Sequence, residues 1–177
     1  MSNALRKKKK PTFFTKKDTM IIGRNDFESR NTERVVIKSY KDYQAIGYII
    51  LHDKFGFGQK RMARLERTVN AYSEAAADDK NMNGVALAYV LKEKYEVNVK
   101  EIVNSVPQSQ LMKLYAWKGH CIEREAYRLS SASLFNYFAL TLTILKKEFK
   151  ITAKQLQYFS DKFIDSLIHW LITSSFS

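Results

Sequence analysis

Residues 51–62 read Leu-His-Asp-Lys-Phe-Gly-Phe-Gly-Gln-Lys-Arg-Met, and the pattern of this stretch occurs three times in the chain. Each copy has a leucine, an aromatic residue four positions later and an apolar residue two after that. A residue that can cap a helix, a basic residue and a further apolar residue then follow. The equivalent positions are Leu51, Leu91 and Leu145; Phe55, Tyr95 and Phe149; Phe57, Val97 and Ile151; Gly58, Asn98 and Thr152; Lys60, Lys100 and Lys154; and Met62, Ile102 and Leu156. This order predicts a helix, a short buried turn and a second helix in each copy.

The first copy has the sharpest turn. Gly56 can adopt a positive φ, and we expect Phe57 to fill the crossing of the two helices. Gly58 would open the second helix, with Met62 and Leu65 facing inward. The outward positions are then Gln59, Lys60, Arg61, Arg64 and Arg67. These side chains are donors for phosphate oxygens and for guanine edges.

Residues 46–69 therefore resemble a phage-type helix–turn–helix, which implies a second helix that enters a DNA groove. That family prefers a small residue immediately after the first apolar position, and this chain has His52 there. The other copies have Lys92 and Lys146 at this position, and they also lack the turn glycine. We expect one candidate DNA reader and two helical corners that build the core.

Composition favours an all-α fold. The chain has 177 residues, 45% of them hydrophobic, with only 6 Gly and 2 Pro. So few turn residues favour helices over many short strands. We predict a compact domain of six to eight helices, with an N-terminal helical lobe at 18–117 and a C-terminal lobe or hairpin at 118–177.

Apolar spacing places the individual helices. The expected helices cover 40–54, 62–77, 85–106 with its internal turn and a stop at Pro107, 109–117, 123–149 and 153–172. Residues 18–39 give a mixed signal: a helix that starts at Asp26 or Asn31, or a short strand at 35–37.

The charge is high and uneven. The formal net charge is +12, and residues 1–17 hold seven basic and no acidic residues, so we predict a flexible basic arm there. The basic residues of this arm are Arg6, Lys7, Lys8, Lys9, Lys10, Lys16 and Lys17. Such a run attracts nucleic acid or an acidic protein surface, and a solubilising tail is the plain alternative.

No pattern indicates catalysis. The single cysteine, Cys121, follows His120, and adjacent side chains diverge on a helix or strand, which disfavours a nucleophile–base pair. No Cys or His pair has the spacing of a zinc site. The turn at 56–58 lacks the Lys-Ser/Thr ending of a phosphate loop. We expect no enzyme activity, no metal and no cofactor.

Two functions from different classes follow. The first is a non-enzymatic DNA-binding accessory or regulatory protein. Its contacts would be the arm residues together with Gln59, Lys60, Arg61 and Arg64. The second follows from the phrase at residues 51–61, which resembles small Lys-rich helical proteins of phages and mobile elements of Gram-positive bacteria. That resemblance implies an anti-defence protein of the anti-CRISPR type, which binds a host RNA-guided nuclease and blocks DNA cleavage.

The expected surroundings follow from the same features. One cysteine cannot form a disulfide within the chain, which favours a reducing compartment, here the cytoplasm of a bacterial host. The longest apolar stretch, 134–145, is too short to span a bilayer, so we expect no membrane partner. Apolar residues near the C-terminus could pack in the core or form a homo-oligomer contact in a phage assembly protein. They are Trp170, Leu171, Ile172 and Phe176.

Overall fold

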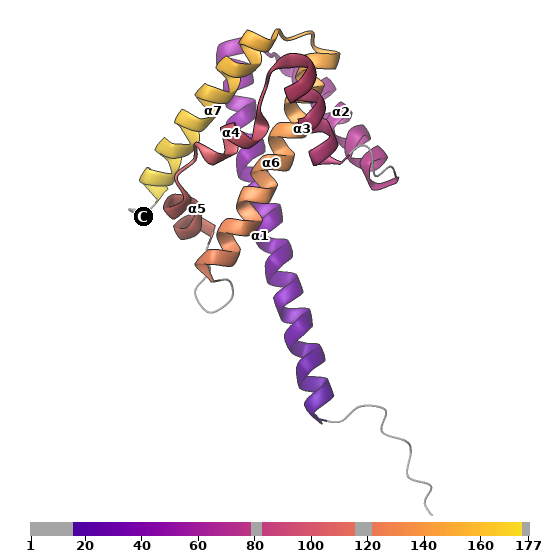
Figure 1. Cartoon of the computed structure of the whole chain (residues 1–177), viewed down its shortest axis with the longest axis vertical. Helices are drawn as coiled ribbons and strands as arrows, with labels where there is room; N and C mark the ends of the chain where they lie inside the picture. The colour runs from indigo at the N-terminus through magenta and orange to yellow at the C-terminus, as the bar shows by residue number, and fades with distance from the viewer. Residues whose placement is uncertain (1–15, 79–82, 116–121, 175–177) are drawn as a thin grey trace, which may run out of the picture.

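The computed structural model describes residues 16–78, 83–115 and 122–174, and it is all-α over these ranges (Figure 1). The seven helices are α1 (Lys16–Phe55), α2 (Gln59–Asp78), α3 (Gly84–Tyr95), α4 (Val99–Asn104), α5 (Gln108–Tyr115), α6 (Glu123–Glu148) and α7 (Ala153–Ser174). The predicted fold class is confirmed. No helix in the described ranges has the length and apolarity needed to cross a bilayer.

The first helix is longer than its sequence indicates. α1 runs without a break from Lys16 to Phe55, so both the expected start at Asp26 or Asn31 and the strand at 35–37 are wrong. Val35 is buried, whereas Val36 and Ile37 are exposed. The β-branched residues 35–37 favour a strand by local propensity, but they form part of a helical turn in which only Val35 faces the core.

The start of α1 also corrects the boundary of the basic arm. Lys16 and Lys17 belong to the first turn of the helix and not to a flexible segment. Lysine is a good helix former. The flexible arm predicted at 1–17 therefore does not include Lys16 and Lys17, and residues 1–15 lie outside the described residues.

The three copies of the sequence pattern adopt the same turn. The backbone N–H groups of Phe57, Val97 and Ile151 donate to the carbonyl six residues back, at Leu51, Leu91 and Leu145. The N···O distances are 3.0, 3.2 and 3.1 Å. The residue before each donor has a positive φ of 62°, 57° or 58°, at Gly56, Glu96 and Lys150. Each helix thus ends at a residue in the left-handed conformation, which is glycine once and a non-glycine residue twice.

The residues that follow each turn start the next helix as predicted. The Asn98 side chain accepts a hydrogen bond from the Glu101 N–H. Thr152 and Gln155 form a reciprocal pair, in which each side chain accepts from the other residue's backbone N–H at 3.2 and 3.0 Å. Gly58 holds the equivalent position before α2 and has no side chain to offer.

The three turns lie at one end of the molecule. Figure 1 shows α1, α3 and α6 running toward the same end, at the top of the view. Phe57 and Phe149 are packed there with ring centroids 5.0 Å apart. The Lys146 Nζ lies 4.9 Å from the centre of the Tyr95 ring. Contacts between side chains thus join the ends of all three helices.

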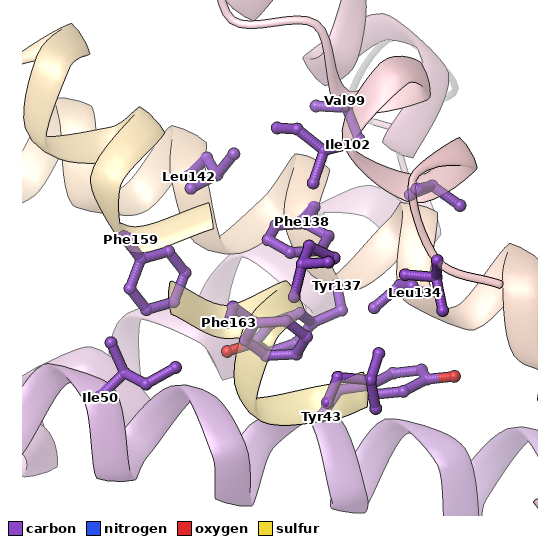
Figure 2. Packing of buried hydrophobic residues seen from close by; sticks show 14 of the residues in the cluster. Tyr43, Ile50, Val99, Ile102, Leu134, Tyr137, Phe138, Leu142, Phe159 and Phe163 are labelled. Atoms are coloured by element: carbon purple, nitrogen blue, oxygen red, sulfur yellow. The ribbon is translucent and has the colours of Figure 1, made fainter. Parts of the chain in front are cut away.

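The core forms where α1, α6 and α7 meet. Figure 2 shows Phe163 of α7 among side chains from the other two helices. Its ring centroid lies 5.3 Å from that of Tyr137, 4.8 Å from that of Phe138 and 6.3 Å from that of Tyr43. One hydrophobic cluster takes residues from both 18–117 and 118–177, so the two predicted segments share a single core.

Tyrosines are unusually important inside this core. The Tyr43 hydroxyl donates to the Ser130 carbonyl at 3.2 Å, and the Tyr115 hydroxyl donates to Asp42 Oδ2 at 3.1 Å. Tyr137 is buried against Gly47, where any β-carbon would overlap its hydroxyl. Burial raises the pKa of the hydroxyl groups of Tyr43, Tyr115 and Tyr137 well above their ordinary value.

Glycine substitutions test the left-handed turns. We expect Lys150→Gly to raise the free energy of unfolding by about 1 kcal/mol, because glycine has no β-carbon to strain a positive φ. Lys147→Gly, the same exchange inside the last turn of α6, should lower it by about 1 kcal/mol. Urea unfolding followed by circular dichroism measures both. Equal destabilisation by the two substitutions would contradict the role given to the turn.

Alkaline unfolding tests the buried tyrosines. The unfolded chain loses tyrosine protons near pH ~10, whereas the folded protein retains them in the core. The stability from each such tyrosine is complete below that pH and falls above it by about 1.4 kcal/mol per pH unit. Tyr43→Phe should make the dependence of the unfolding free energy on pH shallower by about that amount. An unchanged slope would show that Tyr43 ionises equally in both states.

Candidate nucleic-acid interface

The predicted contact residues divide into two groups in the structure. Arg6, Lys7, Lys8, Lys9 and Lys10 lie outside the described residues. Lys16 and Lys17 begin α1, at the end of the helix that Figure 1 shows far from the three turns. Gln59, Lys60, Arg61 and Arg64 all lie in the first two turns of α2 and are exposed. The arm and the α2 residues are therefore attached to opposite ends of α1.

Two arginines of α2 contact the aromatic rings of the turns that follow α1 and α6. The Arg61 guanidinium carbon lies 3.9 Å from the centre of the Phe57 ring and 5.8 Å from that of Phe149. The Arg64 guanidinium carbon lies 5.1 Å from the Phe149 ring centre. Arg64 also donates to the carbonyl and to the side chain of Glu148, both at 3.3 Å. Stacking of this kind fixes a guanidinium without neutralising its charge.

This contact brings basic residues from two distant parts of the chain together. Lys147 and Lys150 flank Glu148 and Phe149, and both are exposed. We define the turn surface as six exposed basic residues around the Phe57–Phe149 pair. They are Lys60, Arg61, Arg64 and Arg67 of α2, with Lys147 and Lys150 at the end of α6. Glu148 is the acidic residue in direct contact with this group.

The two lysines from the end of α6 were not among the predicted contacts. Copy three of the sequence pattern includes this stretch, so a local signal was present. What the sequence does not show is that copies one and three touch, because Phe57 and Phe149 are far apart along the chain. That proximity is a property of the packing.

The start of α2 adds backbone donors to the turn surface. The first N–H groups of any helix have no partner within the helix. Asn98 and Thr152 satisfy such groups at the starts of α4 and α7 with their side chains, but Gly58 cannot. No acidic residue lies in the first turn of α2. Exposed N–H groups next to basic side chains form a suitable site for a phosphate.

The placement of α2 differs from the predicted helix–turn–helix. In the DNA-binding unit the second helix lies across the first. Here the main helical neighbour of α2 is α6 and not α1. His52 is exposed, and its Nδ1 lies 2.8 Å from Asp53 Oδ1, so it does not stand at a crossing of α1 and α2. The helix–turn–helix family has a small residue where this chain has His52, and this difference accompanies the packing of α2 on α6 instead of on α1.

The second copy of the pattern has a different electrostatic character. Beside its turn, α4 and α7 line a groove that includes four carboxylates, from Glu96, Glu101, Asp161 and Asp165. An acidic groove repels a phosphate backbone. The turns after α1 and α6 lie next to each other at the Phe57–Phe149 contact, whereas the turn after α3 borders the acidic groove.

A metal site receives no support from the described residues. No group of three or more Cys, His, Asp or Glu side chains is arranged to hold a metal ion within the described ranges. His120 and Cys121 lie outside those ranges.

Comparison with known proteins adds no family to this description. None of the protein-family models, curated proteins or solved structures searched matches the chain.

Proposed function

We propose that the protein binds duplex DNA without catalysis and that the turn surface makes the principal contacts to the phosphate backbone. The observation that supports this most directly is the convergence of two basic turns on the Phe57–Phe149 pair. A surface that presents six cations and uncapped helix N–H groups is suited to a row of phosphates.

The basic arm would add a second contact. Residues 1–15 contain five of the basic residues of the chain and no acidic residue. Short basic arms supplement helical DNA-binding elements by contacting the minor groove or the backbone. Gln59 and Lys60 occupy the first positions of α2, which is the part of a recognition helix that contacts base edges.

The alternative proposal is an inhibitor of a host RNA-guided nuclease. It would use the same turn surface against an acidic patch of the nuclease. Arginines that stack on aromatic rings, as Arg61 does on Phe57, are frequent anchors in protein interfaces. A nuclease captured by the wild-type protein but not by a turn-surface variant, with no DNA binding by either, would favour this alternative.

A salt titration tests the DNA proposal. We expect binding to a labelled duplex, followed by fluorescence anisotropy, to weaken steeply as salt rises. Lys147→Gln/Lys150→Gln removes two phosphate contacts and should reduce the slope of log K against log salt by about 2. Both lysines are exposed, so we expect the substitutions to leave the fold unchanged. Deletion of residues 1–15 should reduce the slope further.

The matched control removes the same number of positive charges at positions outside the turn surface. Lys41→Gln/Lys162→Gln removes two lysines from α1 and α7, away from the three turns. This variant should keep the wild-type slope. Equal slopes for both double variants would show that the turn surface does not contact DNA, and absence of binding at low salt would contradict the proposal altogether.

Substitution of Glu148 should strengthen DNA binding, in contrast to the lysine substitutions. Glu148→Gln removes a carboxylate from the turn surface and releases Arg64 from its ion pair, for which the N···O distance is 3.3 Å. DNA affinity at low salt should rise by about threefold, because a like charge near the phosphates is lost. The measurement is the same anisotropy titration. Unchanged or weaker binding would show that Glu148 does not face the DNA.

A further inference from the structure

A second basic site lies on the other half of α6. A cleft that is open to solvent lies between α4, the start of α5 and the first turns of α6, and its volume is about 540 Å³. The residues that line it include Lys100 and Asn104 of α4, Gln108 of α5, and Arg124, Arg128 and Phe135 of α6. This volume is in the range of small-molecule sites, about 300–1,000 Å³. None of these residues belongs to the turn surface.

The charge in the cleft is positive. Lys100, Arg124 and Arg128 line it together with one carboxylate, Glu125. That carboxylate is already occupied by Arg128, whose Nε and Nη2 donate to its two oxygens at 3.0 and 2.6 Å. These hydrogen bonds lower the pKa of Glu125. Lys100 and Arg124 remain as cations whose charge is not balanced inside the cleft.

Neutral donors accompany these cations. The amide groups of Asn104 and Gln108 and the hydroxyl of Ser131 line the same space. Gln108 is also the first residue of α5, where backbone N–H groups lack partners inside the helix. An anion with several oxygen atoms would find both charge and directed hydrogen bonds here.

Apolar and aromatic side chains also line the cleft. Phe135 and Tyr127 of α6 are half-buried, Val103 of α4 is buried and Ala132 is exposed. An inorganic anion cannot stack on these aromatic rings, so they favour a ligand that also has an aromatic group. A planar base stacks on aromatic rings with a gain of about 1–3 kcal/mol per base.

From these features we infer that the cleft binds a nucleoside phosphate, with the phosphate group at Lys100 and Arg124 and the base against Phe135 or Tyr127. The ligand is either a free nucleotide or the terminal nucleotide of a nucleic-acid strand, which share this chemistry. The inference goes beyond the proposed function, because the turn surface and the cleft have no residue in common.

Calorimetric titration of the full chain tests the inference, with ADP as the probe. Adenosine and inorganic phosphate, each lacking one half of the ligand, should bind at least about tenfold more weakly than ADP. Lys100→Gln/Arg124→Gln should weaken ADP binding by at least about tenfold, and the folding of this variant should be unaffected because both side chains are exposed. Phe135→Leu should weaken ADP binding and leave that of inorganic phosphate unchanged.

The controls separate the cleft from the turn surface. Lys147→Gln/Lys150→Gln should bind ADP as the wild type does, whether or not it still binds duplex DNA. A 5′-phosphorylated single-stranded oligonucleotide that binds more tightly than ADP, with the same sensitivity to Lys100→Gln/Arg124→Gln, would identify a strand end as the source of the ligand. Absence of ADP binding, or equal affinity in the cleft variant and the wild type, would overturn the inference.

Discussion

The fold depends on one hydrogen bond that is made three times, from a backbone N–H to the carbonyl six residues earlier. Each of these bonds ends a helix, reverses the chain and places an apolar side chain under the turn. The carbonyls belong to leucines whose side chains are buried in the core. The same residues therefore accept the hydrogen bond that ends each helix and anchor that helix end in the core. Because α1, α3 and α6 stop at the same end, α2, α4 and α7 return from that end, and only α5 lies outside this scheme.

The local part of this architecture can be predicted from the sequence. The turns after Phe55, Tyr95 and Phe149 follow from the spacing of apolar and capping residues, because a helix end is decided within a few positions. The extent of α1 could not be predicted in the same way. Residues 35–37 prefer a strand by local propensity, and they become helical because Val35 and Tyr43 pack in a core made by α6 and α7.

The candidate site shows the same division. The exposure of Gln59, Lys60, Arg61 and Arg64 follows from the helical period of α2, and the structure has these residues exposed. Copy three of the pattern includes Lys147 and Lys150, but the pattern does not place them beside α2. This placement depends on the contact between Phe57 and Phe149, which brings two turns together from distant parts of the chain. The sequence therefore predicts the exposed basic face of α2 but not its contact with the turn that follows α6.

The length of α1 has a geometric consequence for any extended ligand. A helix of 40 residues is about 60 Å long, so Lys16, which follows the basic arm in sequence, lies about that far from the turn at the other end of α1. On B-form DNA this distance corresponds to about 17 base pairs, or nearly two turns of the double helix. If arm and turns hold one duplex, α1 acts as a spacer that sets the minimum length of the site. Shortening α1 by whole helical turns would then shorten the protected stretch of DNA in equal steps.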